Sequence, residues 1–200
     1  MALTPRRTNP LALAVLTCLF ERPMHPYEVA QTLRHRAKHE SIKLNYGSLY
    51  NVVESLERQG LIEARETVRE GRRPERTIYA ITERGTREMT DWLSELVSSP
   101  AEEYPQFVAA LSLMAALPPN EVVALLRQRA ETLEIGLATR RAAIRAAVDA
   151  GLARLFVIED EYRIAMQESE LAYIQALAKD IETGQLDGLE LWKTMYASEP

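Results

Sequence analysis

The chain has 200 residues and a mass of 22.6 kDa, enough for one large domain or two small ones. Hydrophobic residues at 46% and charged residues at 26% are the usage of an ordinary globular protein, which excludes collagen-like and wholly disordered chains. The net charge of −5 combines two opposed parts, because residues 1–90 hold 15 Lys and Arg against 11 Asp and Glu, whereas residues 91–200 hold 9 against 18. The first part therefore has a net charge of +4, compatible with a polyanionic partner, and the second has −9.

An apolar run near the N-terminus, residues 11–20, follows Arg6 and Arg7 and so imitates the start of a signal peptide. It has no small-residue cleavage site after it, and it is shorter than the roughly 20 apolar residues that span a bilayer. The run therefore predicts a helix with a buried face and no membrane partner. Cys18 is the single cysteine and is expected to be a buried thiol, which favours a cytoplasmic location.

Three amphipathic helices are predicted before residue 61. Asn9-Pro10 is a strong start for the first, because Asn caps a helix well and Pro is tolerated at its first position. The third carries one buried stripe at the i, i+3, i+4, i+7 spacing, made of Leu49, Val52, Val53 and Leu56. The expected helices cover residues 10–22, 26–38 and 47–60.

Two strands rich in Ile, Thr, Val and Tyr follow, at residues 61–67 and 76–81, with a turn at residues 70–74 between them. Thr82 then opens a fourth, connecting helix. Three helices followed by a hairpin are the plan of a winged helix-turn-helix domain, which we place at residues 1–98. The predicted fold class is mainly α, with this winged domain preceding an all-α domain.

The first turn of the third helix and the tip of the hairpin carry the candidate DNA contacts. In a winged helix-turn-helix the third helix enters the major groove, where hydroxyl and amide side chains contact phosphates and base edges. Asn51 is suited to bidentate pairing with adenine, and the arginines of the hairpin suit phosphates or a narrow minor groove. The predicted DNA-binding residues are Lys43, Tyr46, Ser48, Tyr50, Asn51, Arg72, Arg73 and Arg76.

The composition changes at residues 98–100, and the sequence beyond predicts an all-α domain at residues 99–200. Its expected elements are a short apolar helix at residues 107–116, a long helix capped by Asn120, and a second long helix at residues 153–183. Small or apolar residues recur at heptad spacing in the long helices, which therefore need a partner helix. The predicted dimerisation residues are Val123, Leu126, Leu133, Leu137, Ile144, Ile164, Leu171 and Ile174.

Four N-terminal motifs occur in order along the chain: His25-Pro26-Tyr27-Glu28, Gly47-Ser48-Leu49-Tyr50, residues 57–62 and residues 79–85. Together they resemble the PadR family of bacterial transcriptional regulators, in which the first motif is His-Gly-Tyr-Glu and the second begins the recognition helix. The C-terminal part is similar to the long helical domain of that family's larger subgroup at residues 104–105, 117–119 and 158–162. The resemblance extends from about residue 10 to residue 183, with Pro26 in place of the usual glycine.

This resemblance implies a homodimeric repressor whose C-terminal helices dimerise and whose two winged domains bind a palindromic double-stranded operator. It also implies release by a small molecule, for which the family suggests a phenolic acid or another aromatic compound. Aromatic residues near the junction of the two parts are candidate walls of the effector pocket, and ordinary core packing is the alternative interpretation of each. They are Trp92, Tyr104, Phe107, Phe156 and Tyr162.

The sequence also bears on three other classes of function. An enzyme is not indicated, since a Gly-rich phosphate loop, a nucleophile elbow and a His-Glu-x-x-His motif are all lacking, and we predict no catalytic residue and no cofactor. His35 and His39 are four residues apart on one predicted helix, a spacing that suits a metal-responsive regulator, although the neighbouring cations disfavour a metal. A helical protein-interaction module without DNA activity is the remaining alternative.

Overall fold

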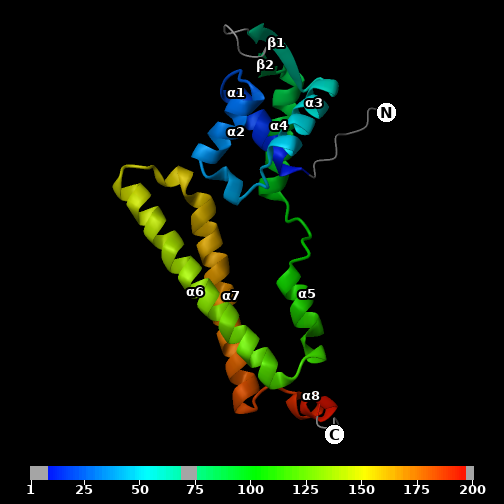
Figure 1. Cartoon of the computed structure of the whole chain (residues 1–200), viewed down its shortest axis with the longest axis vertical. Coiled ribbons are helices and arrows are strands. Elements are labelled where there is room, and N and C mark those ends of the chain that lie inside the picture. Colours follow the sequence, from blue (N-terminus) through cyan, green and yellow to red (C-terminus); the bar gives the residue numbers. More distant parts are fainter. Residues whose placement is uncertain (1–8, 69–75, 197–200) are drawn as a thin grey trace. The chain divides into compact units, whose positions relative to one another are not determined.

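The computed structural model describes residues 9–68 and 76–196. The chain divides into two units, Met1–Glu102 and Glu103–Pro200 (Figure 1). Each unit has its own hydrophobic core. The sequence places the boundary at residues 98–99, at the end of the connecting helix. No helix among the described residues combines the length and the apolar character that crossing a bilayer requires.

The described part of the N-terminal unit has the order helix, helix, helix, hairpin, helix, which confirms the predicted winged helix-turn-helix fold. Strands β1 and β2 pair antiparallel, from Ile62 opposite Ile81 to Val68 opposite Arg76. The predicted turn at residues 70–74 lies outside the described residues. The bounds are α1 Pro10–Glu21, α2 Pro26–His35, η1 (a 3-10 helix) Lys38–Glu40, α3 Tyr46–Arg58, β1 Ile62–Val68, β2 Arg76–Ile81 and α4 Glu83–Ser98.

Polar side chains cap the helices of this unit. Asn9 and Thr82 each accept a hydrogen bond from a backbone N–H in the first turn of α1 and α4, at 3.1 and 3.0 Å. Helix α3 begins at Tyr46, slightly earlier than predicted, because Asn45 Oδ1 accepts a hydrogen bond from the backbone N–H of Ser48 at 2.7 Å. The N-cap of α3 is thus the side chain of Asn45, which places the start of the helix before Gly47.

Helix α2 ends at His35, and the expected continuation to Lys38 is wrong. Ala37 adopts a left-handed backbone conformation with a φ of 55°, which no α-helix can continue through. Residues 38–40 then form the separate 3-10 helix η1, so His39 does not share a helix with His35. The spacing argument for a metal pair therefore fails, and no group of three or more His, Cys, Asp or Glu positioned to hold a metal occurs among the described residues.

The core of the N-terminal unit is built from the apolar faces of α1, α2 and α3 together with the start of the hairpin and one face of α4. Its largest fully buried side chains include Leu16, Met24, Leu49 and Leu61. Cys18 is part of this core, and burial raises the pKa of its thiol to about 11. The thiol is therefore protonated at neutral pH and is a packing residue, as the sequence predicts.

The C-terminal unit is helical throughout its described elements. Helices α6 and α7 lie side by side along most of their length (Figure 1). Its core is formed by buried side chains of α6, α7 and α8, including Leu126, Ile174 and Trp192. The bounds are α5 Gln106–Leu113, η2 Met114–Ala116, α6 Pro119–Asp149, η3 Arg154–Phe156, α7 Ile158–Thr183 and α8 Leu189–Tyr196, in which η2 and η3 are 3-10 helices.

Three details of this unit differ from the expectation. Pro118 and not Asn120 occupies the N-cap of α6, because Pro119 starts the helix as its first residue. Helix α7 starts at Ile158, after the 3-10 turn η3, instead of at residue 153. Helix α8 was not predicted, and it is anchored to the rest of the unit by a hydrogen bond of 2.8 Å from Trp192 Nε1 to the carbonyl oxygen of Leu117.

Candidate nucleic-acid interface

Helix α3 presents one polar face to solvent, above an apolar stripe. The stripe of Leu49, Val52, Val53 and Leu56 is buried, and it packs the helix against α1 and the rest of the core. On the outer side, Tyr46, Tyr50 and Asn51 are exposed and Ser48 is half-buried. The structure thus gathers these four predicted DNA-binding residues on the first two turns of one helix, where hydroxyl and amide groups can contact a groove of DNA.

The remaining predicted DNA contacts lie beside α3 or in the wing. Lys43 is exposed in the segment between η1 and α3. Arg76 is the first residue of β2, whereas Arg72 and Arg73 lie outside the described residues. The role of all eight residues in DNA binding stays a prediction.

Tyr46 belongs to a cluster of side chains that the spacing of residues in the sequence does not indicate. Its ring stacks on that of Tyr27, with centroids 6.2 Å apart and an angle of 9° between the ring planes. The guanidinium carbon of Arg34 lies 4.3 Å from the centre of the Tyr46 ring, and Arg34 Nη1 donates a hydrogen bond to the Tyr46 hydroxyl oxygen. Tyr27 and Arg34 are two helical turns apart on α2, so the sequence places them on one face but does not indicate that Tyr46 meets them.

The arginines of α2 and its surroundings differ in their partners. Arg36 pairs with Glu21 of α1 at 2.5 Å, and this hydrogen-bonded pair lowers the pKa of the Glu21 carboxyl. Arg22 pairs with Glu28 at 3.2 Å. Arg34 has no carboxylate partner among the described residues, and its contacts there are with Tyr46. Its charge is therefore left available to an anion.

The predicted dimerisation residues are used largely inside one chain. Val123, Leu126, Leu137 and Ile174 are buried, and Leu133, Ile144, Ile164 and Leu171 are half-buried in the single chain. Arg140 follows Leu137 at the same heptad spacing on α6, and it pairs with Asp160 of α7 at 2.7 Å. The partner helix that the heptad spacing demands is thus present within the chain, and a contact of these residues with a second copy stays a prediction.

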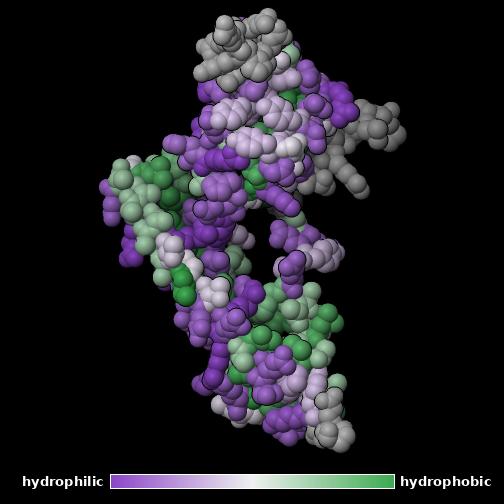
Figure 2. Space-filling view, viewed as in Figure 1, coloured by the Kyte–Doolittle hydropathy of each residue, from purple (hydrophilic) through white to green (hydrophobic). Residues whose placement is uncertain are grey.

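Other apolar side chains of the C-terminal unit are left uncovered. Helix α5 is strongly apolar, yet it has no buried residue, and Val108 and Leu113 are 59% and 70% exposed. Figure 2 shows hydrophobic side chains gathered over this helix. A contiguous apolar surface of this kind marks a contact with another molecule more often than a free surface.

The five aromatic residues proposed for an effector pocket have different surroundings. Trp92 is buried in the core of the N-terminal unit, and its indole Nε1 has no hydrogen-bond partner among the described residues. Phe107 packs against the C-terminal core, and the centre of its ring lies 3.8 Å from the guanidinium carbon of Arg129. The other three are largely exposed: Tyr104, Phe156 and Tyr162. Their assembly into one pocket stays a prediction.

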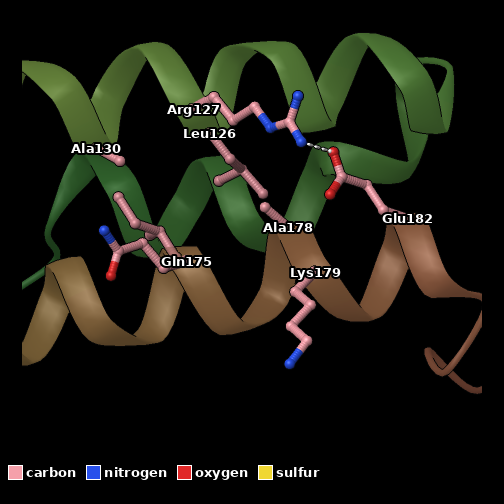
Figure 3. Close-up of a pocket in the computed structure, with 8 residues that line it drawn as sticks. Leu126, Arg127, Ala130, Gln175, Ala178, Lys179 and Glu182 are labelled. Atoms are coloured by element: carbon pink, nitrogen blue, oxygen red, sulfur yellow. Dashed lines mark ion pairs between the residues drawn. The ribbon is translucent and has the colours of Figure 1, made fainter.

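Two hollows in the C-terminal unit are lined by other residues. One, of about 200 Å³, lies in the seam of α6 and α7, where the small side chains of Ala130 and Ala178 leave space (Figure 3). Arg127 from α6 and Glu182 from α7 point toward each other over this seam and form an ion pair of 2.5 Å. The second, of about 410 Å³, shares this pair and extends toward Lys193 of α8.

The N-terminal unit is similar in sequence to transcriptional regulators, and the whole chain is similar in fold to several solved structures. Residues 15–91 match the model of the transcriptional regulator PadR-like family. The chain is similar to the crystal structure of Bacillus subtilis PadR in complex with operator DNA, with a TM-score of 0.68 and 15% sequence identity over 86% of this chain and 99% of that chain. None of the curated proteins compared with this sequence gave a match.

Two further solved structures have the same architecture. The structure of Bacillus subtilis PadR in complex with p-coumaric acid gives a TM-score of 0.65 and 15% identity, over 90% of this chain and 99% of that chain. A PadR-like transcriptional regulator from Bacillus cereus gives a TM-score of 0.58 and 17% identity, over 87% of this chain and 99% of that chain. At these identities the similarity shows a shared fold, a winged helix followed by a helical C-terminal region.

Proposed function

We propose that this chain, whose residues 15–91 match the PadR-like family of transcriptional regulators, is a homodimeric repressor that binds a palindromic operator. The proposal rests mainly on the polar face of α3. On the first two turns of this helix Tyr46, Tyr50 and Asn51 are exposed, opposite the buried apolar stripe. The net charge of +4 on residues 1–90 attracts DNA, whereas the −9 of residues 91–200 is repelled by it. The C-terminal unit therefore joins two DNA-binding heads without contacting DNA itself.

In this proposal α3 enters the major groove with its N-terminal end. The amide of Asn51 pairs with the N6 and N7 of an adenine, which reads sequence, while the hydroxyl groups of Ser48 and Tyr50 contact phosphates or base edges. The wing arginines Arg72, Arg73 and Arg76 contact the adjacent backbone or minor groove. Sequence is thus read by α3, and the wing adds affinity that does not depend on sequence.

Replacing Asn51 with alanine is expected to weaken operator binding about 5-fold to 150-fold, the range for losing one bidentate base contact. Binding to unrelated DNA is expected to stay unchanged, since the lost contact is to a base. The measurement is a fluorescence anisotropy titration of full-length protein on both DNAs. Asn120→Ala, which removes the same exposed amide from the C-terminal unit, is the matched control. If Asn51→Ala weakened binding to both DNAs equally, or weakened neither, Asn51 would not contribute to recognition of the operator sequence.

We place the contact with the second copy on the C-terminal unit. Support comes from the exposed apolar side chains of α5, which a second copy would remove from water, and from the absence of charge on that helix. A two-fold symmetric dimer holds its two α3 helices about 34 to 36 Å apart, or a multiple of that, so that both meet the same side of the DNA.

A small aromatic acid is the proposed releasing molecule, on the support of the Bacillus subtilis PadR structure that contains p-coumaric acid. It acts by binding more tightly to a dimer in which the spacing of the two α3 helices does not match the DNA than to the DNA-bound form. Calorimetric titration with p-coumaric, ferulic and benzoic acids is expected to give saturable heat with at least one of them. A panel without any heat would refute this class of effector.

A further inference from the structure

The cluster of Tyr27, Arg34 and Tyr46 is arranged as a binding site for an anion. Both tyrosines remain about two-fifths exposed, at 42% for Tyr27 and 39% for Tyr46, although their rings are stacked. Arg34 is exposed as well, and it lacks a carboxylate partner among the described residues. The cluster therefore combines two stacked aromatic rings with one positive charge at the surface that no described carboxylate neutralises.

The hydrogen bond between Arg34 and Tyr46 decides what the tyrosine can bind. The guanidinium has only donors, so in this bond the phenol oxygen of Tyr46 is the acceptor. The single hydroxyl proton then has to point away from Arg34, and the adjacent cation makes it a better donor. A partner for this hydroxyl must accept a hydrogen bond and, next to a positive charge, is best an anion.

The position of the cluster selects the kind of anion. Tyr27 and Arg34 belong to α2, and Tyr46 is the first residue of α3. In helix-turn-helix proteins the helix before the recognition helix crosses the DNA backbone, while the recognition helix enters the groove. A group at the meeting point of these two helices therefore faces the phosphates at the edge of the groove.

We propose that Arg34 and Tyr46, with Tyr27 stacked on Tyr46, bind one phosphodiester group of the operator backbone. The inference rests on the proposed function and adds to it a phosphate site on α2 that orients α3 in the groove. The hydroxyl of Tyr46 and a free N–H of Arg34 both donate to the phosphate oxygens. Tyr27 is a positioning residue, because its ring holds that of Tyr46.

The test is a salt titration of DNA binding by the full-length protein and four variants. Arg34→Ala is expected to weaken binding about 10-fold at low salt, on operator and unrelated DNA alike, and to reduce the slope of log affinity against log salt by about 0.9. Arg34→Lys keeps the charge and is expected to keep the slope. Tyr46→Phe is expected to lose affinity on both DNAs without a change of slope, since it removes a neutral donor. Arg36→Ala, which removes a cation already paired with Glu21, is the control and is expected to keep the slope.

A second measurement locates the phosphate. Operator DNAs with one neutral methylphosphonate at successive positions are expected to include a position that weakens binding by the wild type but not by Arg34→Ala. An unchanged slope in Arg34→Ala, or a loss confined to operator DNA, would overturn the phosphate site while the proposed function stands. A wild-type protein that binds no DNA would overturn both.

Discussion

Replacing Gly85 with alanine is expected to destabilise the N-terminal unit by about 3 kcal/mol or more, one of the largest effects of a single methyl group in this chain. A β-carbon at this position would lie 2.0 Å from the carbonyl oxygen of Leu61 and 2.8 Å from Cγ1 of Ile81. The backbone of Leu61 cannot withdraw, because its carbonyl oxygen accepts the backbone N–H of Thr82 at 3.0 Å. The start of α4 would therefore have to separate from the hairpin.

Urea denaturation followed by circular dichroism measures this loss of stability. Gly136→Ala is the matched control, since Gly136 lies within α6 and a β-carbon there would meet no atom within 4 Å. That variant is expected to gain about 0.5 to 1 kcal/mol, the ordinary preference of a helix interior for alanine over glycine. If Gly85→Ala were as stable as the wild type, the close packing of α4 on the hairpin would be refuted.

Removing the C-terminal unit is expected to weaken operator binding by about 100-fold or more. A dimer binds its second half-site as an intramolecular step, and this effective concentration raises affinity by about 10² to 10⁴ over that of one head. A chain ending at Glu102 keeps the winged domain with its own core but has lost the proposed dimer contact. Anisotropy titrations on the palindromic operator measure the loss.

The control for this truncation is a DNA that carries a single half-site. On it the truncated and intact chains are expected to bind equally, because only one head can be used. Circular dichroism of the truncated chain establishes that the winged domain is folded. Equal affinity of the two chains for the full operator would contradict the dimer.

The winged domain was predictable because its signals are local. The i, i+3, i+4, i+7 stripe of α3 requires one buried face, and Thr82 caps α4 through a neighbouring backbone N–H. The end of α2 was not predictable in the same way. Ala37 takes a left-handed conformation that usually belongs to glycine, so nothing in the residue type indicated the break after His35.

Helix α8 and the cluster around Tyr46 depend on contacts between distant segments. Trp192 is held by the carbonyl oxygen of Leu117, 75 residues earlier, and Arg34 meets Tyr46 across two helices. No spacing rule within one helix reports such contacts. The heptad pattern of α6 predicts that one face of the helix is buried. It does not indicate whether α7 or a second chain covers that face.

A mobility-shift titration of the full-length protein tests whether this chain recognises specific DNA. The DNA is the region upstream of its own coding sequence, because regulators of this kind commonly control their own expression, and unrelated DNA of equal length is the competitor. We expect a retarded complex that survives a large excess of competitor and shows two-fold symmetric protection in a footprint. The absence of a complex, or its complete loss to unrelated DNA, would contradict sequence-specific DNA binding by this chain.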